Sequence, residues 1–496
     1  MSGAGPVTST TVRMIISDLH AGDPASLLTV LDDTYSPLPG VVSPTTSSFS
    51  KAILATLNAM QLPALPELIL LGDGMDFSLA KPDQSAAVLA KFLAALSPAQ
   101  TFGQISFVPG NHDHALWTLG RGGAAPSQGS DPGKAAYWAH TSPAFVPPSG
   151  VGTTRILNDV LKAAGQLLPV ATYYPNLGLL PAQPAPSGLR RAVVLHHGHF
   201  VESTYLTMSS VLSALSGRSM FPMMAKAIEA ANGSWIDFMF SAFGDDGALG
   251  KQVSLYERVM EDGAGAKAFQ DRLAAFLTRQ LLQSLPLPMT PQLTTALGYI
   301  SKGLVDVIVG SAGQAERYSY NEYLTPSSLQ GLIAYIGQVV LTQMVDELGA
   351  NNLPEQVTFI FGHTHKPFAD QIVVPGFAAP VSVYNSGGWV LDIPQMSSVE
   401  GASVVFVDGD LNTATLQVYG MSENGSVLPA VVSSADPIPD AENPMFLKLE
   451  KSVKANSKLW DSFRDTVEAE LIKKCNMYLA LADTEAARST PMGLAR

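Results

Sequence analysis

The sequence predicts an α/β fold, in which short buried strands alternate with helices. The first observation is a set of five short apolar runs, each of which ends at a polar motif. The second observation is a helical periodicity of apolar residues between these runs. Functional sites in open α/β sheets lie beyond the carboxyl ends of the strands. The five motifs are therefore expected to meet at one edge.

The five predicted strands cover residues 12–16, 67–71, 105–108, 192–195 and 357–361. The motifs that follow them read, in order, SDLH, GDGMD, PGNHDH, HHGH and GHTH. After the last motif, residues 381–384 form a further predicted strand, which leads into the turn NSGGW. Residues 402–407 and 413–418 flank the turn DGDLN and predict a β-hairpin.

Helices are predicted over residues 49–60 and 86–96, where they connect the first three strands. Residues 120–150 and 175–189 are rich in Gly, Pro and Ser, and we interpret them as surface loops. Residues 323–345 carry no charge, but a proline and several polar side chains interrupt them. This pattern favours a buried helix over a membrane span.

The interval between the fourth and fifth motifs is unusually long and is predicted to be nearly all helical. Its apolar stripes at helical spacing include Phe269, Leu273, Phe276 and Leu277, and Leu329, Leu332, Ile333, Ile336 and Val340. Helices that pack on one another explain such stripes, while a cap beside the site and a contact in a homo-oligomer remain open interpretations. The expected parts of the chain are a core (1–200), a helical insertion (201–350), the rest of the core (351–425) and a C-terminal helical tail (426–496).

Composition excludes several classes of protein. Of the 496 residues, 46% are hydrophobic and 14% are charged, which is typical of a compact globular enzyme. The formal net charge is −13 and no basic run is present, which argues against a nucleic-acid partner. The single cysteine, Cys475, excludes an internal disulfide and a cysteine metal site. The first residues lack a basic start followed by an apolar run, so we expect a cytoplasmic protein.

The motifs supply the oxygen and imidazole donors that transition-metal ions prefer. Asp18 and His20 are one residue apart, so on a loop both side chains are able to reach one ion. Asp73 and Asn111 each follow a glycine, which allows a tight backbone turn. Two ions about 3.5–4 Å apart activate water for attack on a phosphate ester, and such a site needs a carboxylate that bridges both.

The last two motifs are the source of further imidazoles. His197 follows the fourth predicted strand and stands beside a glycine. His363 and His365 alternate in the fifth motif, which places both side chains on one side of a segment expected to be extended.

The motifs DLH, GD, GNHD, HG and GHTH, in this order, resemble those of the calcineurin-like metallophosphoesterase superfamily. The resemblance covers about residues 12–115, 190–200 and 355–420, and leaves out the helical interval and the C-terminal tail. It implies a four-layer α/β/β/α sandwich of two mixed sheets, here with a large helical insertion. It also implies the hydrolysis of phosphate esters at a binuclear metal centre.

The resemblance further implies roles for individual residues. Asp18, His20 and His365 would hold the first ion, Asn111, His197 and His363 the second, and Asp73 would bridge the two. A hydroxide between the ions would attack phosphorus, and His112 would protonate the leaving group. Asp113 is expected to orient the imidazole of His112. Mn, Fe, Zn and Co are all compatible with these ligands.

In the family pattern the metal ligand directly precedes the glycine, which selects His197 in HHGH. His196 would then face the opposite side of the strand, and His199 would be an outer contact of the site or a substrate contact. Lys366, directly after GHTH, is the best placed cation for a phosphate group. For Asp76 in GDGMD, a helix-capping role and the steering of a neighbouring ligand are both open.

The favoured function is hydrolysis of a small-molecule phosphodiester or phosphomonoester, because His112 is present to protonate a poor leaving group. The alternative is a nuclease or a protein phosphatase. The acidic charge weakens the first, and a large insertion beside the site would obstruct the open groove that the second needs. A non-catalytic scaffold is a remote alternative, because such a protein is expected to lose ligands that this sequence contains.

Overall fold

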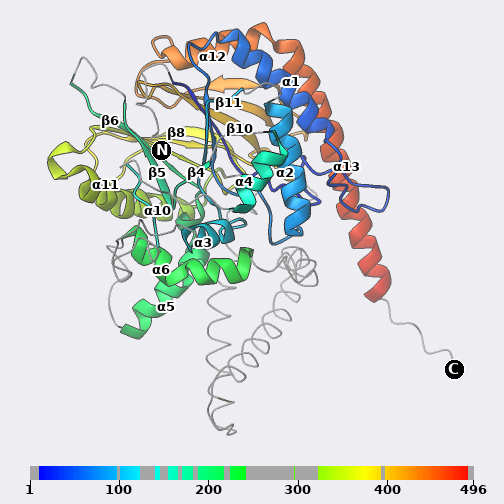
Figure 1. The fold of residues 1–496 in the computed structure, drawn as a ribbon, viewed down its shortest axis with the longest axis horizontal. Coiled ribbons are helices and arrows are strands. Elements are labelled where there is room, and N and C mark those ends of the chain that lie inside the picture. The colour runs from blue at the N-terminus through cyan, green and yellow to red at the C-terminus, as the bar shows by residue number, and fades with distance from the viewer. Residues whose placement is uncertain are drawn as a thin grey trace.

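The computed structural model describes residues 11–97, 101–122, 140–145, 155–165, 170–181, 188–216, 224–241, 295, 322–392 and 397–489. These residues form two mixed β-sheets with helices on their outer sides (Figure 1). The α/β class and the two-sheet sandwich expected from the sequence are therefore confirmed.

The larger sheet has seven strands in the order β12-β11-β10-β1-β2-β3-β4. They are β1 (Arg13–Ile16), β2 (Glu67–Leu70), β3 (Gln104–Phe107), β4 (Val170–Thr172), β10 (Gly401–Val407), β11 (Thr413–Gly420) and β12 (Val431–Ser433). Strands β1 to β4 run parallel, and β1 also pairs antiparallel with β10. The predicted hairpin is the antiparallel pair β10–β11, which attaches the later part of the chain to the first strand.

The smaller sheet has five strands in the order β5-β6-β7-β9-β8. They are β5 (Asn176–Leu179), β6 (Arg191–His196), β7 (Gln356–Phe361), β8 (Phe368–Ile372) and β9 (Val381–Asn385). Strands β6, β7 and β9 run parallel, and antiparallel β5 and β8 form the two edges. The loop interpretation of residues 175–189 was wrong for β5. Four residues are too few to show an alternation, and pairing with β6 supplies the backbone hydrogen bonds.

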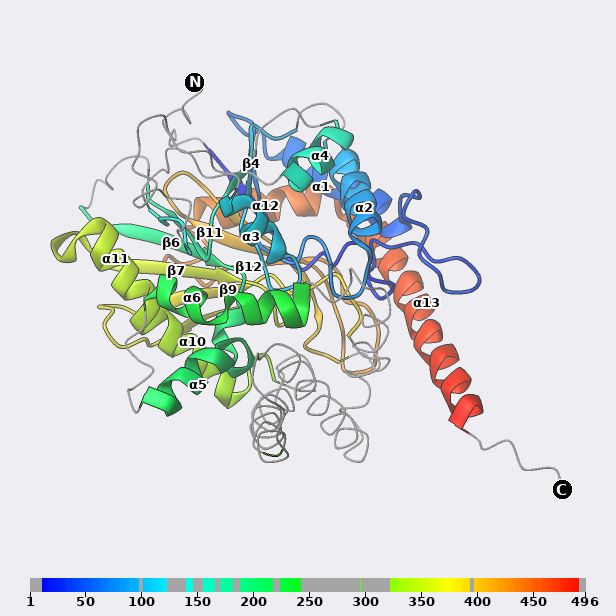
Figure 2. The ribbon, with the colours of Figure 1, turned by 60° about the horizontal axis from the view of Figure 1, so that its bottom comes forward.

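One layer of helices covers the larger sheet and another covers the smaller one (Figures 1 and 2). The first layer contains α1 (Pro44–Ala59), α2 (Pro82–Leu96), α4 (Arg155–Ala163), α12 (Pro444–Ala455) and α13 (Ser457–Ser489). The second contains α6 (Ala225–Ile236), α10 (Pro326–Ala334) and α11 (Leu341–Leu348). Two further helices are α3 (Ala115–Gly122), after the third motif, and α5 (Thr207–Ser216), which packs on α6.

Alternation along the strands builds the four layers. In β1, Met14 and Ile16 pack against the first helical layer, whereas Ile15 lies in the core between the sheets. In β6, Leu195 lies in that same central core, whereas Val194 packs against the second helical layer. Because successive side chains of a strand point to opposite faces, each sheet is apolar on both sides and must be covered on both.

The helical interval is described in part. Helix α10, a π-helical turn (Tyr335–Val340) and α11 form one continuous helix, in which Leu332, Ile336 and Val340 are buried. Among the described residues, this helix alone has the length and apolar composition that a membrane crossing requires, and 39% of its most apolar window is buried in the fold. The expected stripe of Phe269, Leu273, Phe276 and Leu277 lies outside the described residues.

Helix α13 is fixed to the core by an aromatic cluster. The ring of Phe49 in α1 lies 4.7 Å from that of Trp389 and 5.7 Å from that of Phe463 in α13. The backbone N–H of Trp389 donates to the carbonyl of Asp18 at 2.9 Å. Packing in this cluster therefore also supports the first polar motif. The far end of α13 projects from the body of the molecule (Figures 1 and 2).

We predict that Phe463→Ala lowers the free energy of unfolding by about 3–5 kcal/mol, because it leaves a cavity in this fully buried cluster. Urea titration followed by circular dichroism measures the change. Ile472→Ala, on the same helix at 52% exposure, is the matched control and should cost less than about 0.5 kcal/mol. Equal effects of the two substitutions would contradict the role given to the cluster.

Candidate metal centre

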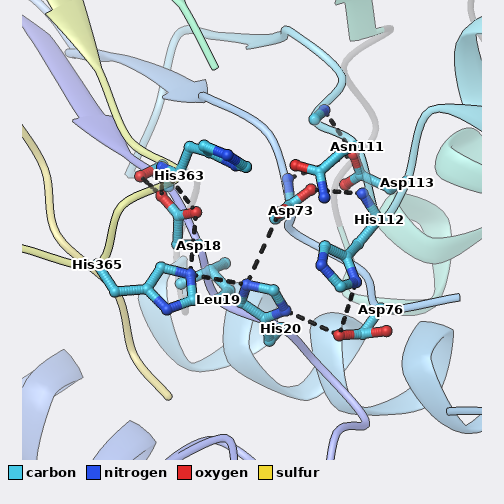
Figure 3. Close-up of polar contacts among 12 residues, drawn as sticks. Asp18, Leu19, His20, Asp73, Asp76, Asn111, His112, Asp113, His363 and His365 are labelled. Carbon is cyan, nitrogen blue, oxygen red and sulfur yellow. Dashed lines mark hydrogen bonds and ion pairs between the residues drawn. The ribbon is translucent and has the colours of Figure 1, made fainter. Parts of the chain in front are cut away.

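Two groups of buried donor side chains lie next to each other at the ends of strands from both sheets (Figure 3). The first donor group is Asp18, His20 and His365, and the second donor group is Asp73, His197 and His363. Within each group the candidate ligand atoms lie within 4.8 Å of one another. The groups are adjacent, since Nε2 of His20 lies 3.7 Å from Oδ2 of Asp73 and Nε2 of His197 lies 3.9 Å from Oδ1 of Asp18.

Asp73, a member of the second donor group, also lies close to the first. Its Oδ2 is 3.1 Å from Nε2 of His197 and 3.7 Å from Nε2 of His20, as a carboxylate shared by two ions requires. Asn111 joins the second group, because its Oδ1 lies 3.1 Å from the same His197 nitrogen. The side-chain amide of Asn111 donates to the hydroxyl of Tyr205 at 3.2 Å, which keeps the amide oxygen towards the group. All seven predicted ligands are thus brought together.

The backbone of these ligands is strained. Of the non-glycine residues that the structure describes, eight have positive φ, and five of the eight are predicted ligands. They are Asp18 (52°), His20 (44°), Asp73 (49°), His363 (71°) and His365 (58°). Such conformations cost about 1–3 kcal/mol each and cluster at functional sites. The expectation that residues 363–365 are extended was wrong. His363 and His365 have a left-handed backbone, which directs each imidazole towards the other ligands of its group.

Two glycines leave space for the ligands. A Cβ atom on Gly110 would collide with the carboxylate of Asp73. A Cβ atom on Gly388, in the NSGGW turn, would lie 2.6 Å from Cγ of His365. The same turn supports the fifth motif, since Asn385 donates hydrogen bonds from its side-chain amide to the GHTH loop.

The two donor groups contain four histidines. In three of them, the ring nitrogen Nδ1 contacts a hydrogen-bond acceptor outside the donor groups. These acceptors are Asp76 for His20 at 2.8 Å, Asp392 for His365 at 2.7 Å and the carbonyl of Leu71 for His197 at 3.0 Å. Metal-ligating histidines usually donate their second ring N–H to a carboxylate or a carbonyl. The contacts therefore present Nε2 of each ring to the donor groups.

The imidazole of His112 is held by a different pair of side chains. Its Nδ1 lies 2.6 Å from Oγ of Ser78 and 3.3 Å from Oδ2 of Asp76. Because the Ser78 hydroxyl donates to Oδ1 of Asp76 at 2.9 Å, it accepts from Nδ1 of His112. Nε2 is then the nitrogen that gains or loses a proton. Asp76 thus steers two imidazoles and does not cap α2, whose N-cap position is Lys81, a residue with no capping hydrogen bond from its side chain.

Asp113 has another role than the one expected. Its carboxylate accepts backbone N–H groups from Gly110 at 2.7 Å, Gly74 at 2.8 Å and Met75 at 3.2 Å. The residue joins the second and third motif loops to each other. The Asp113 carboxylate is thus engaged by backbone N–H groups. The His112 ring is oriented instead by Ser78 and Asp76.

The site concentrates negative charge in a buried place. Burial raises the pKa of Asp73, but the imidazoles of His197 and His112 outweigh burial and hold that pKa well below its usual value. Burial lowers the pKa of His197, yet Asp73 and Asp18 raise it to about 9. Buried carboxylates are stable only when a positive charge or a metal ion compensates them. The donors present therefore fit bound cations.

The other residues singled out by sequence lie beside the site. His196 faces the opposite side of β6, as predicted, with its ring 4.5 Å from that of Tyr335. His199 is buried, and its Nε2 lies 3.2 Å from the hydroxyl of Tyr174. Lys366 is also buried, and its ammonium donates to a backbone carbonyl at 3.0 Å. The roles of His199 and Lys366 as substrate contacts stay predictions.

The helical interval contributes side chains that no motif identified. Oε1 of Glu202 lies 2.9 Å from Nε2 of His363. The ring of Tyr205 lies 5.0 Å from that of His363, and the ring of Phe240 lies 6.4 Å from that of His112. The only sequence signal for Glu202 is its position five residues after a predicted ligand, on the same loop.

A buried ionic cluster ties α6 and the turn after it to the third motif. Nδ1 of His114 lies 2.7 Å from Asp237, and its Nε2 lies 3.2 Å from Glu229. The hydroxyl of Tyr174 donates to Glu229 at 3.0 Å. Burial lowers the pKa of His114, but Glu229 and Asp237 outweigh burial and raise it to about 10. His114 is therefore a cation at neutral pH.

No protein-family model and no curated protein matches this sequence. Among solved structures, 22 chains match. One is a dimetal phosphatase from Danio rerio, at a TM-score of 0.28 and 11% sequence identity, over 86% of this chain and 99% of that chain. At that score the likeness supports no assignment.

We predict that the stability supplied by His114 depends on pH. Its pKa is about 10 in the folded chain and 6.5 ordinarily, so the contribution is complete below pH 6.5 and is lost as pH rises towards 10. His114→Asn should lower the free energy of unfolding by about 3–5 kcal/mol at pH 6, and by much less at pH 10. Urea titrations at both values test this, with His140→Asn, an exposed histidine, as the control. A loss that is the same at both pH values would refute the assignment.

Proposed function

We propose that this chain is a phosphoesterase that depends on two transition-metal ions. The observation that carries the proposal is the pair of adjacent donor groups with Asp73 between them. Mixed carboxylate, amide and imidazole donors suit Mn, Fe, Zn or Co. The motifs that supply these donors resemble those of calcineurin-like metallophosphoesterases, which is why a phosphate ester is the proposed substrate.

The proposed ligand sets follow the two donor groups. Asp18, His20 and His365 would hold one ion, Asn111, His197 and His363 the other, and Asp73 both. Bound ions supply Lewis acidity and lower the pKa of water at the site. The strained backbone of the ligands supports this assignment, since five of the eight described non-glycine residues with positive φ are proposed ligands and such strain clusters at functional sites.

His112 is the proposed proton donor to the leaving group. Ser78 and Asp76 hold its Nδ1, so Nε2 would carry the proton that the departing oxygen receives. The Asp76 carboxylate, which also touches His20, stabilises the protonated imidazole. His112 is thereby coupled to the donor groups without belonging to the predicted ligands.

A small organic phosphodiester or phosphomonoester is the proposed substrate. The net charge of −13 disfavours a nucleic acid, because an acidic surface repels a polyanion. The rings of Tyr205 and Phe240 lie 4.7 Å apart, close to His363 and His112. Aromatic rings beside polar groups are typical of pockets for small organic molecules.

We expect the purified chain to contain close to two transition-metal ions, and Asp73→Asn to lose more metal and activity than a change of any other ligand. The reason is that the Asp73 carboxylate faces an imidazole of each donor group and is the proposed bridge between the two ions. Elemental analysis and hydrolysis of chromogenic phosphate mono-, di- and triesters, with each metal added back to stripped protein, measure both quantities. Asp370→Asn, an exposed change on β8, is the control. Full activity of metal-free protein would overturn the proposal.

A second prediction concerns His112. His112→Ala should keep both ions, yet slow the hydrolysis of esters with poor leaving groups by about 10²–10⁴-fold. Esters of nitrophenol should be affected little, because nitrophenolate leaves without a proton. Initial rates on matched alkyl and nitrophenyl esters give the comparison. Equal losses on both would show that His112 positions the phosphate group and does not donate a proton.

A further inference from the structure

The fourth histidine of the donor groups is held differently from the other three. His20, His197 and His365 each use Nδ1 for an outer acceptor. In His363 it is Nε2 that meets a carboxylate, since this nitrogen lies 2.9 Å from Oε1 of Glu202. Both groups are buried, with Glu202 at 8% exposure and His363 at 0%. The contact therefore fixes which ring nitrogen of His363 remains for the second donor group.

We propose that Glu202 positions His363, because its carboxylate lies against Nε2 at ion-pair distance and so leaves Nδ1 to the ion held by the second donor group. This inference rests on the proposed metal-dependent function and adds a residue to it. Outer carboxylates of this kind fix both the tautomer and the orientation of a ligating imidazole. Glu202 would do for the second ion what Asp392 does for the first through His365.

The local backbone explains how Glu202 reaches this place. It stands between two short 3₁₀ turns, η2 (His199–Val201) and η3 (Ser203–Leu206), with an extended backbone at φ −100° and ψ 138°. Its backbone N–H donates to the carbonyl of His199 at 3.1 Å, and its carbonyl accepts from Tyr205 at 3.2 Å. The two turns direct the carboxylate back towards the strand ends, on the same loop as His197.

Helix α10 holds this loop in position. Gly331 lies against the carbonyl of Val201, so closely that a Cβ atom would overlap the oxygen. A cavity of about 270 Å³ lies beside Glu202, and its walls include Phe200, Leu206 and Ile228. The helical interval thus shapes the metal centre directly, in addition to any contact with substrate.

The test compares metal binding in six full-length chains stripped of metal: wild type, Glu202→Gln, Glu202→Ala, Asp392→Asn, the double variant with Glu202→Gln and Asp392→Asn, and Glu355→Gln. Glu355 is an exposed glutamate paired with Arg190 and serves as the control. Calorimetric titration with Co²⁺, together with the visible spectrum of the bound ion, follows each binding step. Thermal unfolding of the stripped chains checks that the fold is intact, and Glu202→Ala provides a second variant.

We expect Glu202→Gln to weaken one of the two binding steps by about 10–100-fold and to leave the other unchanged. Asp392→Asn should weaken the other step, so the double variant should weaken both. Glu355→Gln should bind as wild type does. Two unchanged binding steps in a folded Glu202→Gln or Glu202→Ala chain, next to a wild type that binds two ions, would overturn this inference alone. A wild type that binds no Co²⁺ would overturn the proposed function as well.

Discussion

The buried negative charge of Asp18 and Asp73 is the constraint on which the rest of this structure depends. Both carboxylates are fully buried, and the imidazoles around them lower their pKa values. Ionised carboxylates in such a place need compensating positive charge, and neighbouring imidazoles supply it where no ion is bound. Asp73 and Asp18 raise the pKa of His197 to about 9, as this excess of buried negative charge requires. The proposed binding of two ions satisfies the same requirement with more charge.

Holding these groups together has a conformational cost that the surroundings offset. Left-handed backbone at five ligands would relax if the loops were mobile. Asp113 prevents this by joining the second and third motif loops, and the NSGGW turn supports the fifth. The aromatic cluster of α1 and α13 supports the first motif through Trp389. Much of the core thus serves to keep a strained site in shape.

Sequence predicted the parts of the fold that have a local signal. The strands that precede the motifs and the β10–β11 hairpin were found because apolar runs and turn residues are local patterns. Strand β5 was missed, since its stability comes from pairing with β6 and not from its own four residues. The motifs identified the seven predicted ligands, which the fold brings together. They did not identify Glu202, Ser78 and Asp392, which contact the imidazoles of the site. Such partners depend on how distant loops pack, which no spacing in one sequence reveals.

The donor groups draw on segments far apart in the chain. The carboxylate of Asp18 accepts the backbone N–H of His363, 345 residues away, and the two follow strands of different sheets. Contacts of such long range form slowly, because the entropy of closing the intervening chain must be overcome before they are made. The site is therefore complete only after both sheets have docked. An ion bound by ligands from both sheets would favour the docked state over partly folded ones, so that it would also stabilise the whole architecture.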